Sequence, residues 1–221
     1  MDIKTQYFIM AQGIGSRWTL DRRFMTELPA EYKWFIPLNG ETIITRILRQ
    51  LNDKNFVVVM SLSHARLLPF GTPICQLHEP TGSILRGIWT VIRKKWDADR
   101  FVFLLGDVVY SKRMLDVIFT NKDNELLFYG RNGQNEITGK EASEIFGISF
   151  GRSELENIEF DLYSIWKPEE ENYNLKLWLL LRYVNGNMLY LPYDFTDDVD
   201  SPQGYLKFFK KLEKAAWEDE H

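Results

Sequence analysis

The sequence predicts an α/β fold with three layers, in which helices cover both faces of a mostly parallel mixed sheet. Short runs of apolar, β-branched and aromatic residues alternate along the chain with segments of helical period. Parallel strands need crossover connections, which are usually helices, so this alternation indicates a parallel sheet. Ligands of such sheets bind at the carboxyl ends of the strands. Functional residues are therefore expected where each strand ends.

Seven apolar segments are candidate strands: Gln6 to Ala11, Phe56 to Ser61, Ile74 to Leu77, Phe101 to Leu105, Leu126 to Gly130, Phe146 to Phe150 and Met188 to Leu191. Two early segments have apolar residues on one helical face, 43–51 and 84–92. Beyond about residue 125 the pattern loosens, and 174–183 is a further candidate helix. A final helix is expected to begin at Ser201-Pro202 and to bury Leu206, Phe209 and Leu212.

Composition indicates one ordinary globular domain spanning residues 1–221. The chain is 45% hydrophobic with a formal net charge of −4, and no long basic stripe marks a nucleic-acid partner. Cys75 is the only cysteine, which excludes an internal disulfide and fits a reducing compartment. The early apolar run is too short for a signal peptide or a membrane span. We therefore expect a cytoplasmic protein with no membrane or nucleic-acid partner.

A glycine-containing loop directly follows the first strand, with the sequence Ala11-Gln12-Gly13-Ile14-Gly15-Ser16-Arg17. Glycines let backbone N–H groups approach a phosphate, and Arg17 offers a forked, charge-assisted contact to phosphate oxygens. The segment lacks the Gly-Lys-Ser/Thr ending of a P-loop, and Trp18 replaces the third glycine of a dinucleotide fingerprint. On its own the segment fits a tight turn with a surface arginine equally well.

A second segment runs from Lys33 through Trp34-Phe35-Ile36-Pro37-Leu38-Asn39 to Gly40, and a helix follows. The glycine and arginine loop, then a lysine, apolar residues, proline, glycine and a helix, resembles the signature of the NTP-transferase family of sugar-phosphate and related nucleotidyltransferases. The resemblance implies a Rossmann-like fold of the glycosyltransferase-A type. It also implies that Lys33 contacts the nucleotide phosphates, whereas a solvated loop lysine is the alternative.

A third segment, Cys75-Gln76 and then Thr81-Gly82-Ser83-Ile84, resembles the part of the family signature that holds the base and ribose. A glutamine amide offers a donor and an acceptor to a base edge, and a Gly-Ser helix start presents free N–H groups. Read alone, Gly82-Ser83 fits a simple helix cap better. The resemblance implies a nucleotide site made of Ala11, Gln12, Gly13, Ile14, Gly15, Ser16, Arg17, Lys33, Gln76, Gly82, Ser83 and Asp107.

Carboxylates that fit a magnesium ion occur at two places. Asp107 follows the apolar strand that ends at Leu105-Gly106, and Mg²⁺ prefers oxygen ligands together with waters and substrate phosphates. The acidic stretch before Ser201-Pro202 is similar to one with which many family members begin their last helix, where an acidic residue supplies a second metal contact. By that resemblance Asp200 is the leading candidate and Asp198 the second. The alternatives are a turn-capping role for Asp107 and a helix-dipole role for the later residues.

The resemblance implies an Mg²⁺-dependent enzyme that transfers NMP from an NTP to a small phosphorylated acceptor and releases pyrophosphate. Arg17, Lys33 and Asp107 would be catalytic, residues 1–125 would bind the nucleotide, and 126–221 would bind the acceptor. Arg131, Lys140 and Arg152 are cations available for an acceptor phosphate, although surface charge is the favoured interpretation of each. The sequence leaves open a homo-oligomer.

Several departures from the family pattern keep two other functions open. Gln12 stands where the family usually has a small residue, Tyr32 replaces the usual proline, and Gln203-Gly204 replaces Glu-Asp. A nucleotide-sugar-dependent glycosyltransferase is one alternative, although the Asp-X-Asp motif expected at a central strand is missing there. A catalytically inactive nucleotide-binding protein of the same fold is the other.

Overall fold

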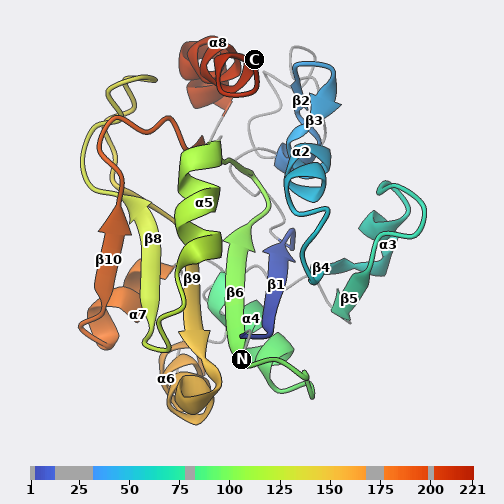
Figure 1. Cartoon of the computed structure of the whole chain (residues 1–221), viewed down its shortest axis with the longest axis vertical. Helices are drawn as coiled ribbons and strands as arrows, with labels where there is room; N and C mark the ends of the chain where they lie inside the picture. Colours follow the sequence, from blue (N-terminus) through green and yellow to red (C-terminus); the bar gives the residue numbers. More distant parts are fainter. Residues whose placement is uncertain (1–2, 13–31, 78–82, 168–176, 199–201) are drawn as a thin grey trace.

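The structure is a computed structural model that describes residues 3–12, 32–77, 83–167, 177–198 and 202–221, built around a seven-stranded sheet (Figure 1). The strands lie in the order β10-β8-β9-β6-β1-β4-β5. Their bounds are Thr5–Met10 for β1, Phe56–Ser61 for β4, Ile74–Leu77 for β5, Arg100–Leu105 for β6, Leu127–Arg131 for β8, Glu144–Gly151 for β9 and Asn187–Tyr190 for β10.

Strand direction brings many strand ends to one edge of this sheet. Among its strands β9 is antiparallel to both neighbours, β6 and β8, and the other pairings are parallel. The carboxyl ends of β1, β4, β5, β6, β8 and β10 therefore share one edge with the start of β9. The prediction of a mostly parallel mixed sheet is confirmed.

Helices cover both faces of the sheet, as predicted (Figure 1). Along β1, Tyr7 and Ile9 enter one core, whereas Phe8 and Met10 enter the other, because successive side chains of a strand point to opposite faces. The first core contains residues from α2 (Ile43–Gln50), α5 (Lys112–Thr120) and α8 (Pro202–Glu218). The second contains residues from α4 (Ile84–Ile92), α6 (Leu155–Trp166) and α7 (Leu177–Tyr183).

Short elements complete the chain: the 3-10 turns η2 (Lys33–Phe35) and η3 (Arg152–Glu154), the helix α3 (Leu62–Ala65), and the two-residue strands β2 (Pro37–Leu38), β3 (Glu41–Thr42), β7 (Val108–Val109) and β11 (Asp197–Asp198). None of the helices in the described ranges is long and apolar enough to cross a membrane.

The predicted elements differ from the observed ones mainly at their ends and in the second half of the chain. The bounds of β4 and β5 agree with the prediction, whereas β9 begins two residues earlier and ends one residue later. Helices α5 and α6 were not predicted, although Ile158, Leu162 and Trp166 of α6 are buried at a helical spacing of four residues. Phe209 and Leu212 are buried as expected. Ser201 and the side chain of Leu206 lie outside the described part.

The strand order reverses at β1. From β1 the chain continues to β4 and then β5 on one side, and α4 then leads back to β6 on the other side of β1. In open α/β sheets, ligands bind at such a reversal, beyond the carboxyl ends of the two strands that flank it. The fold thus points to the loops that follow β1 and β6.

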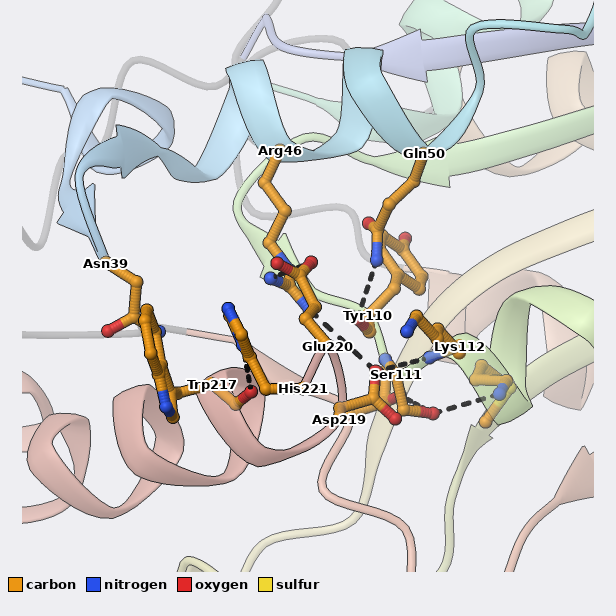
Figure 2. A network of polar contacts seen from close by, with 12 residues as sticks. Asn39, Arg46, Gln50, Tyr110, Ser111, Lys112, Trp217, Asp219, Glu220 and His221 are labelled. Atoms are coloured by element: carbon orange, nitrogen blue, oxygen red, sulfur yellow. Dashed lines mark hydrogen bonds and ion pairs between the residues drawn. The ribbon is translucent and has the colours of Figure 1, made fainter.

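A network of ion pairs links the last residues of the chain to α2 (Figure 2). The guanidinium of Arg46 has 1% side-chain exposure and pairs with Glu220, and Asp219 and Glu41 lie 3.8 and 4.0 Å from it. Burial lowers the pKa of Arg46, and the negative charges of Glu220 and Glu41 oppose that effect. Asp219 also accepts a hydrogen bond from the backbone N–H of Lys112, at the start of α5. The network therefore joins α2, α5 and the end of α8.

We expect Glu220→Ala to lower the free energy of unfolding by about 1–3 kcal/mol, because it removes the close partner of a buried guanidinium. Chemical denaturation would measure the change. Glu218→Ala is the matched control, since Glu218 is exposed and pairs only with the exposed Lys214 in the described part of the chain. That variant should lose less than about 0.5 kcal/mol. Equal losses in the two variants would contradict a structural role for the Arg46 network.

Candidate active site

The ends of β1 and β6 meet closely at the point where the strand order reverses. The backbone N–H of Gly106 donates to the carbonyl of Met10 at 3.1 Å. A Cβ atom at position 106 would lie 3.2 Å from the Cβ of Ala11, which is tighter than ordinary packing. Glycine at 106 therefore lets the strand end that carries Asp107 approach the loop that begins at Ala11.

Lys33 and Asp107 lie 74 residues apart in the sequence and come together here. The Nζ atom of Lys33 lies 3.3 Å from Oδ2 of Asp107, with side-chain exposures of 11% and 26%. Lys33 begins the 3-10 turn η2, and the next residue, Trp34, is buried and stacks on Tyr32 with ring centroids 5.3 Å apart. The anchored indole holds the turn against the core, so that the lysine side chain reaches the end of β6.

The buried hydroxyl of Tyr110 holds the turn that follows β6. The single hydroxyl proton of Tyr110 is shared between two carbonyls, that of Phe146 at 2.7 Å and that of Leu105 at 3.2 Å. Burial raises the pKa of Tyr110 well above its ordinary value, and the nearby charge of Asp107 acts in the same direction. Tyr110 therefore stays neutral and keeps its proton for these hydrogen bonds, which hold the turn that presents Asp107.

The second acidic segment lies beside the first. Strand β11 pairs antiparallel with β7, and Asp198 stands opposite Val108, the residue after Asp107. The side chain of Asp198 pairs with the ammonium of Lys140. Within the described residues, then, the carboxylates at 107 and 198 belong to neighbouring backbone segments. Asp200 lies outside the described residues.

Asp197, which sequence reasoning did not single out, is the more deeply buried of the two carboxylates described in this segment, with 2% side-chain exposure against 11% for Asp198. Its oxygens accept hydrogen bonds from Arg131 at 3.1 Å, Asn135 at 3.2 Å and Thr138 at 2.9 Å. Arg131 is the last residue of β8, and Asn135 and Thr138 belong to the following loop. Asp197 thus ties that loop to the strand next to Asp107. In the sequence Asp197 is one of several neighbouring acidic residues, and nothing there distinguishes it as the buried partner of Arg131.

The three cations considered for an acceptor phosphate have different surroundings. Arg131 and Lys140 are buried against the acidic pair 197–198, so interpreting them as surface charges was wrong. Arg152 follows the carboxyl end of the antiparallel β9, at the opposite edge of the sheet, where it donates to the carbonyls of Ala98 and Trp96. Arg152 is exposed, in agreement with the surface-charge interpretation, and its two hydrogen bonds make it part of the scaffold.

The predicted nucleotide residues are brought together only in part. Ala11 and Gln12 are buried at the end of β1, and the side-chain amide of Gln12 donates to the carbonyl of Ser83 at 3.3 Å. Ser83 caps α4, as the simpler interpretation of that motif expected, by accepting from the N–H of Arg86. Gln76 is exposed on the edge strand β5, two strands away from β1.

Several predicted residues lie outside the described part: Gly13, Ile14, Gly15, Ser16, Arg17, Gly82 and Asp200. Among the residues that are described, no group of three or more acidic, histidine or cysteine side chains is arranged to hold a metal ion. A magnesium ion held by one or two carboxylates and completed by waters and substrate phosphates does not require such a group. Asp107, at the end of β6, is a single carboxylate of that kind, and in this structure Asp107 and Asp198 pair with Lys33 and Lys140 respectively.

The fold is similar to that of several solved nucleotidyltransferases. No protein-family model and no curated protein matches the sequence. Similar solved structures include a nucleotidyl transferase from Methanothermobacter, 15% identical, covering 96% of this chain and 99% of the other with a TM-score of 0.65. The inositol-1-phosphate CTP transferase from T. maritima is 14% identical, with 98% of each chain covered and a TM-score of 0.63. The CTP:phosphocholine cytidylyltransferase from Streptococcus pneumoniae is 16% identical, covering 96% and 99%, also at 0.63.

These comparisons confirm the predicted fold class. The similar structures are nucleotidyltransferases, the family that the motifs of the sequence resemble, and almost the whole of this chain aligns with almost the whole of each.

Proposed function

We propose that this protein is a Mg²⁺-dependent nucleotidyltransferase that transfers NMP from an NTP to a small phosphorylated acceptor, a sugar phosphate or an alcohol phosphate. The observation that carries the proposal is the 3.3 Å contact between Lys33 and Asp107 at the reversal of the strand order. At this position the carboxylate of Asp107 could bind the metal ion, and the ammonium of Lys33 could neutralise charge on the phosphates of a metal-bound triphosphate.

The chain's own residues would act mainly by positioning and by neutralising charge. An acceptor phosphate oxygen attacks the α-phosphorus of the NTP in line with the leaving pyrophosphate, so both reactants are anionic. Lys33 would turn from Asp107 to the phosphate oxygens, and Arg17 would contact them from the glycine-containing loop. Asp107 would hold the metal ion, with Asp198 or Asp200 as second ligand. Bound there, Mg²⁺ would offset the charge that develops on the leaving pyrophosphate.

The two halves of the chain would bind different substrates. Residues 1–125 would bind the nucleotide, and 126–221, which includes the last helix, would bind the acceptor. The similar structures named for CTP and for inositol-1-phosphate or phosphocholine support an acceptor of this size and charge. We place the enzyme in the cytoplasm, in keeping with its single, buried cysteine.

A pyrophosphate-release screen of the four NTPs against sugar 1-phosphates and alcohol phosphates tests the proposal. We expect release with at least one pair of substrates, dependent on added Mg²⁺ and abolished by chelation. Release of NDP from a nucleotide sugar instead would identify a glycosyltransferase. NTP binding without turnover of any acceptor would identify an inactive nucleotide-binding protein. Either result would overturn the assignment.

A further inference from the structure

The amide of Gln12 connects two segments that are 71 residues apart in the chain. Gln12 directly follows β1, where its side chain is buried, with 2% of the residue exposed. Its Nε2 atom donates to the carbonyl of Ser83 at 3.3 Å. That carbonyl also accepts the N–H of Gly87 at 3.1 Å, the first hydrogen bond of α4. The start of the glycine-containing loop is thereby fixed to the start of the helix.

Gly87 provides the space that this amide occupies. A Cβ atom at position 87 would lie 1.8 Å from Nε2, 2.1 Å from Oε1 and 2.3 Å from Cδ of Gln12. No real pair of atoms approaches so closely, so any larger residue at 87 would displace the amide. A glycine inside a helix destabilises it relative to alanine, and one that lies there commonly has a packing reason. Residues 12 and 87 therefore fit together as a complementary pair.

The pair explains one departure of this sequence from the family pattern. A glutamine stands where a small residue is usual, and the opposing helix position is a glycine that accommodates it. The amide donates one of its two hydrogens to the carbonyl of Ser83, in the segment proposed to hold the base and ribose, while the backbone at Gln12 leads into the loop proposed to hold the phosphates. The spacing between those two parts of a nucleotide site would thus depend on one side chain.

We infer that Gln12 is a positioning residue for the nucleotide, which acts through Ser83 and the start of α4 and requires Gly87 opposite it. This inference rests on the proposed function. If Gln12 only filled the core, its removal would lower stability and leave NTP affinity unchanged. As a positioning residue it changes NTP affinity, and acceptor affinity stays as it was.

A double-mutant cycle of Gln12→Ala, Gly87→Ala and the double variant tests the inference. Binding of each of the four NTPs would be measured by calorimetry, the KM for NTP and for acceptor by kinetics, and the melting temperature without ligand. We expect each single variant to raise the Kd of the bound NTP by about tenfold, the effect of roughly one misplaced hydrogen-bonding contact. Gly87→Ala should do so without melting α4, since alanine favours helices and the amide can swing away.

The double variant should bind NTP no more weakly than the weaker single variant, because both substitutions disrupt the same contact. Gln6→Ala is the matched control: Gln6 is likewise a buried glutamine, but it lies near the start of β1, where its amide donates to the carbonyls of Tyr7 and Asn55. That control should keep the NTP affinity. Unchanged affinity in either single variant, losses that multiply in the double variant, or an equal loss in Gln6→Ala would each overturn the inference. If the unmodified protein binds no NTP, the proposed function itself fails.

Discussion

Replacing Asp107 with alanine is expected to lower the rate of pyrophosphate release by about 10³-fold while the protein stays folded. Asp107 would be the metal ligand at the end of β6, and without it the metal-bound triphosphate loses its fixed position. The side chain of Asp107 is about a quarter exposed and lies in a loop after β6, so the fold should tolerate the change. A pyrophosphate-release assay and the circular dichroism spectrum would measure the two effects.

Asp97→Ala is the matched control for this experiment. Asp97 is an exposed carboxylate that also pairs with a lysine, Lys4, but it lies before β6, at the opposite edge of the sheet. Turnover should be unchanged in that variant. Full turnover by a well-folded Asp107→Ala protein would refute the assignment of Asp107, and an equal loss in both variants would show that the effect is general.

Replacing Asp197 with asparagine is expected to lower the free energy of unfolding by about 3–5 kcal/mol, the loss seen when one member of a buried ion pair is removed. The substitution keeps the shape of the side chain and removes its charge, which leaves the guanidinium of Arg131 buried without its carboxylate. An amide also turns one donor toward groups that are themselves donors, Asn135 and Thr138. For a protein of this size such a loss is a large fraction of the total stability.

Denaturant unfolding of Asp197→Asn beside Asp53→Asn would measure this effect. Asp53 is an exposed carboxylate that pairs with its neighbour Lys54. Surface pairs of this kind contribute little, so that variant should unfold at the same denaturant concentration as the unmodified protein. A midpoint for Asp197→Asn that coincides with the control would mean that the buried cluster at residues 131, 138 and 197 does not hold this part of the fold.

The first half of the chain was predicted closely because its signals are local. Buried parallel strands such as Phe56–Ser61 are short apolar runs, and the helices between them, α2 and α4, bury one continuous face. Farther along the chain, α5 and α6 were not predicted. Their apolar residues are mixed with charged ones such as Lys112, Arg113 and Asp161, and the packing against the sheet stabilises them more than sequence propensity does.

Some residues of the candidate site could likewise be predicted from the sequence, and others could not. Lys33 and Asp107 could be proposed from motifs because each follows an element that the sequence shows, and parallel strands bring such ends to one edge. The roles of Arg131 and Lys140 were not predictable. Whether a cation is a surface charge or half of a buried pair depends on a partner some sixty residues away, and a single sequence carries no record of that contact.

The sequence by itself determined the α/β order of elements and the positions at which strands end, because both follow from apolar patterns within a few residues of each other. Only the tertiary structure decided that Lys33 meets Asp107, that Asp197 neutralises Arg131, and that Gly87 leaves room for the amide of Gln12. Those contacts join segments 66 to 75 positions apart. Their energies arise from burial and close packing, which exist only once the sheet has brought the segments together.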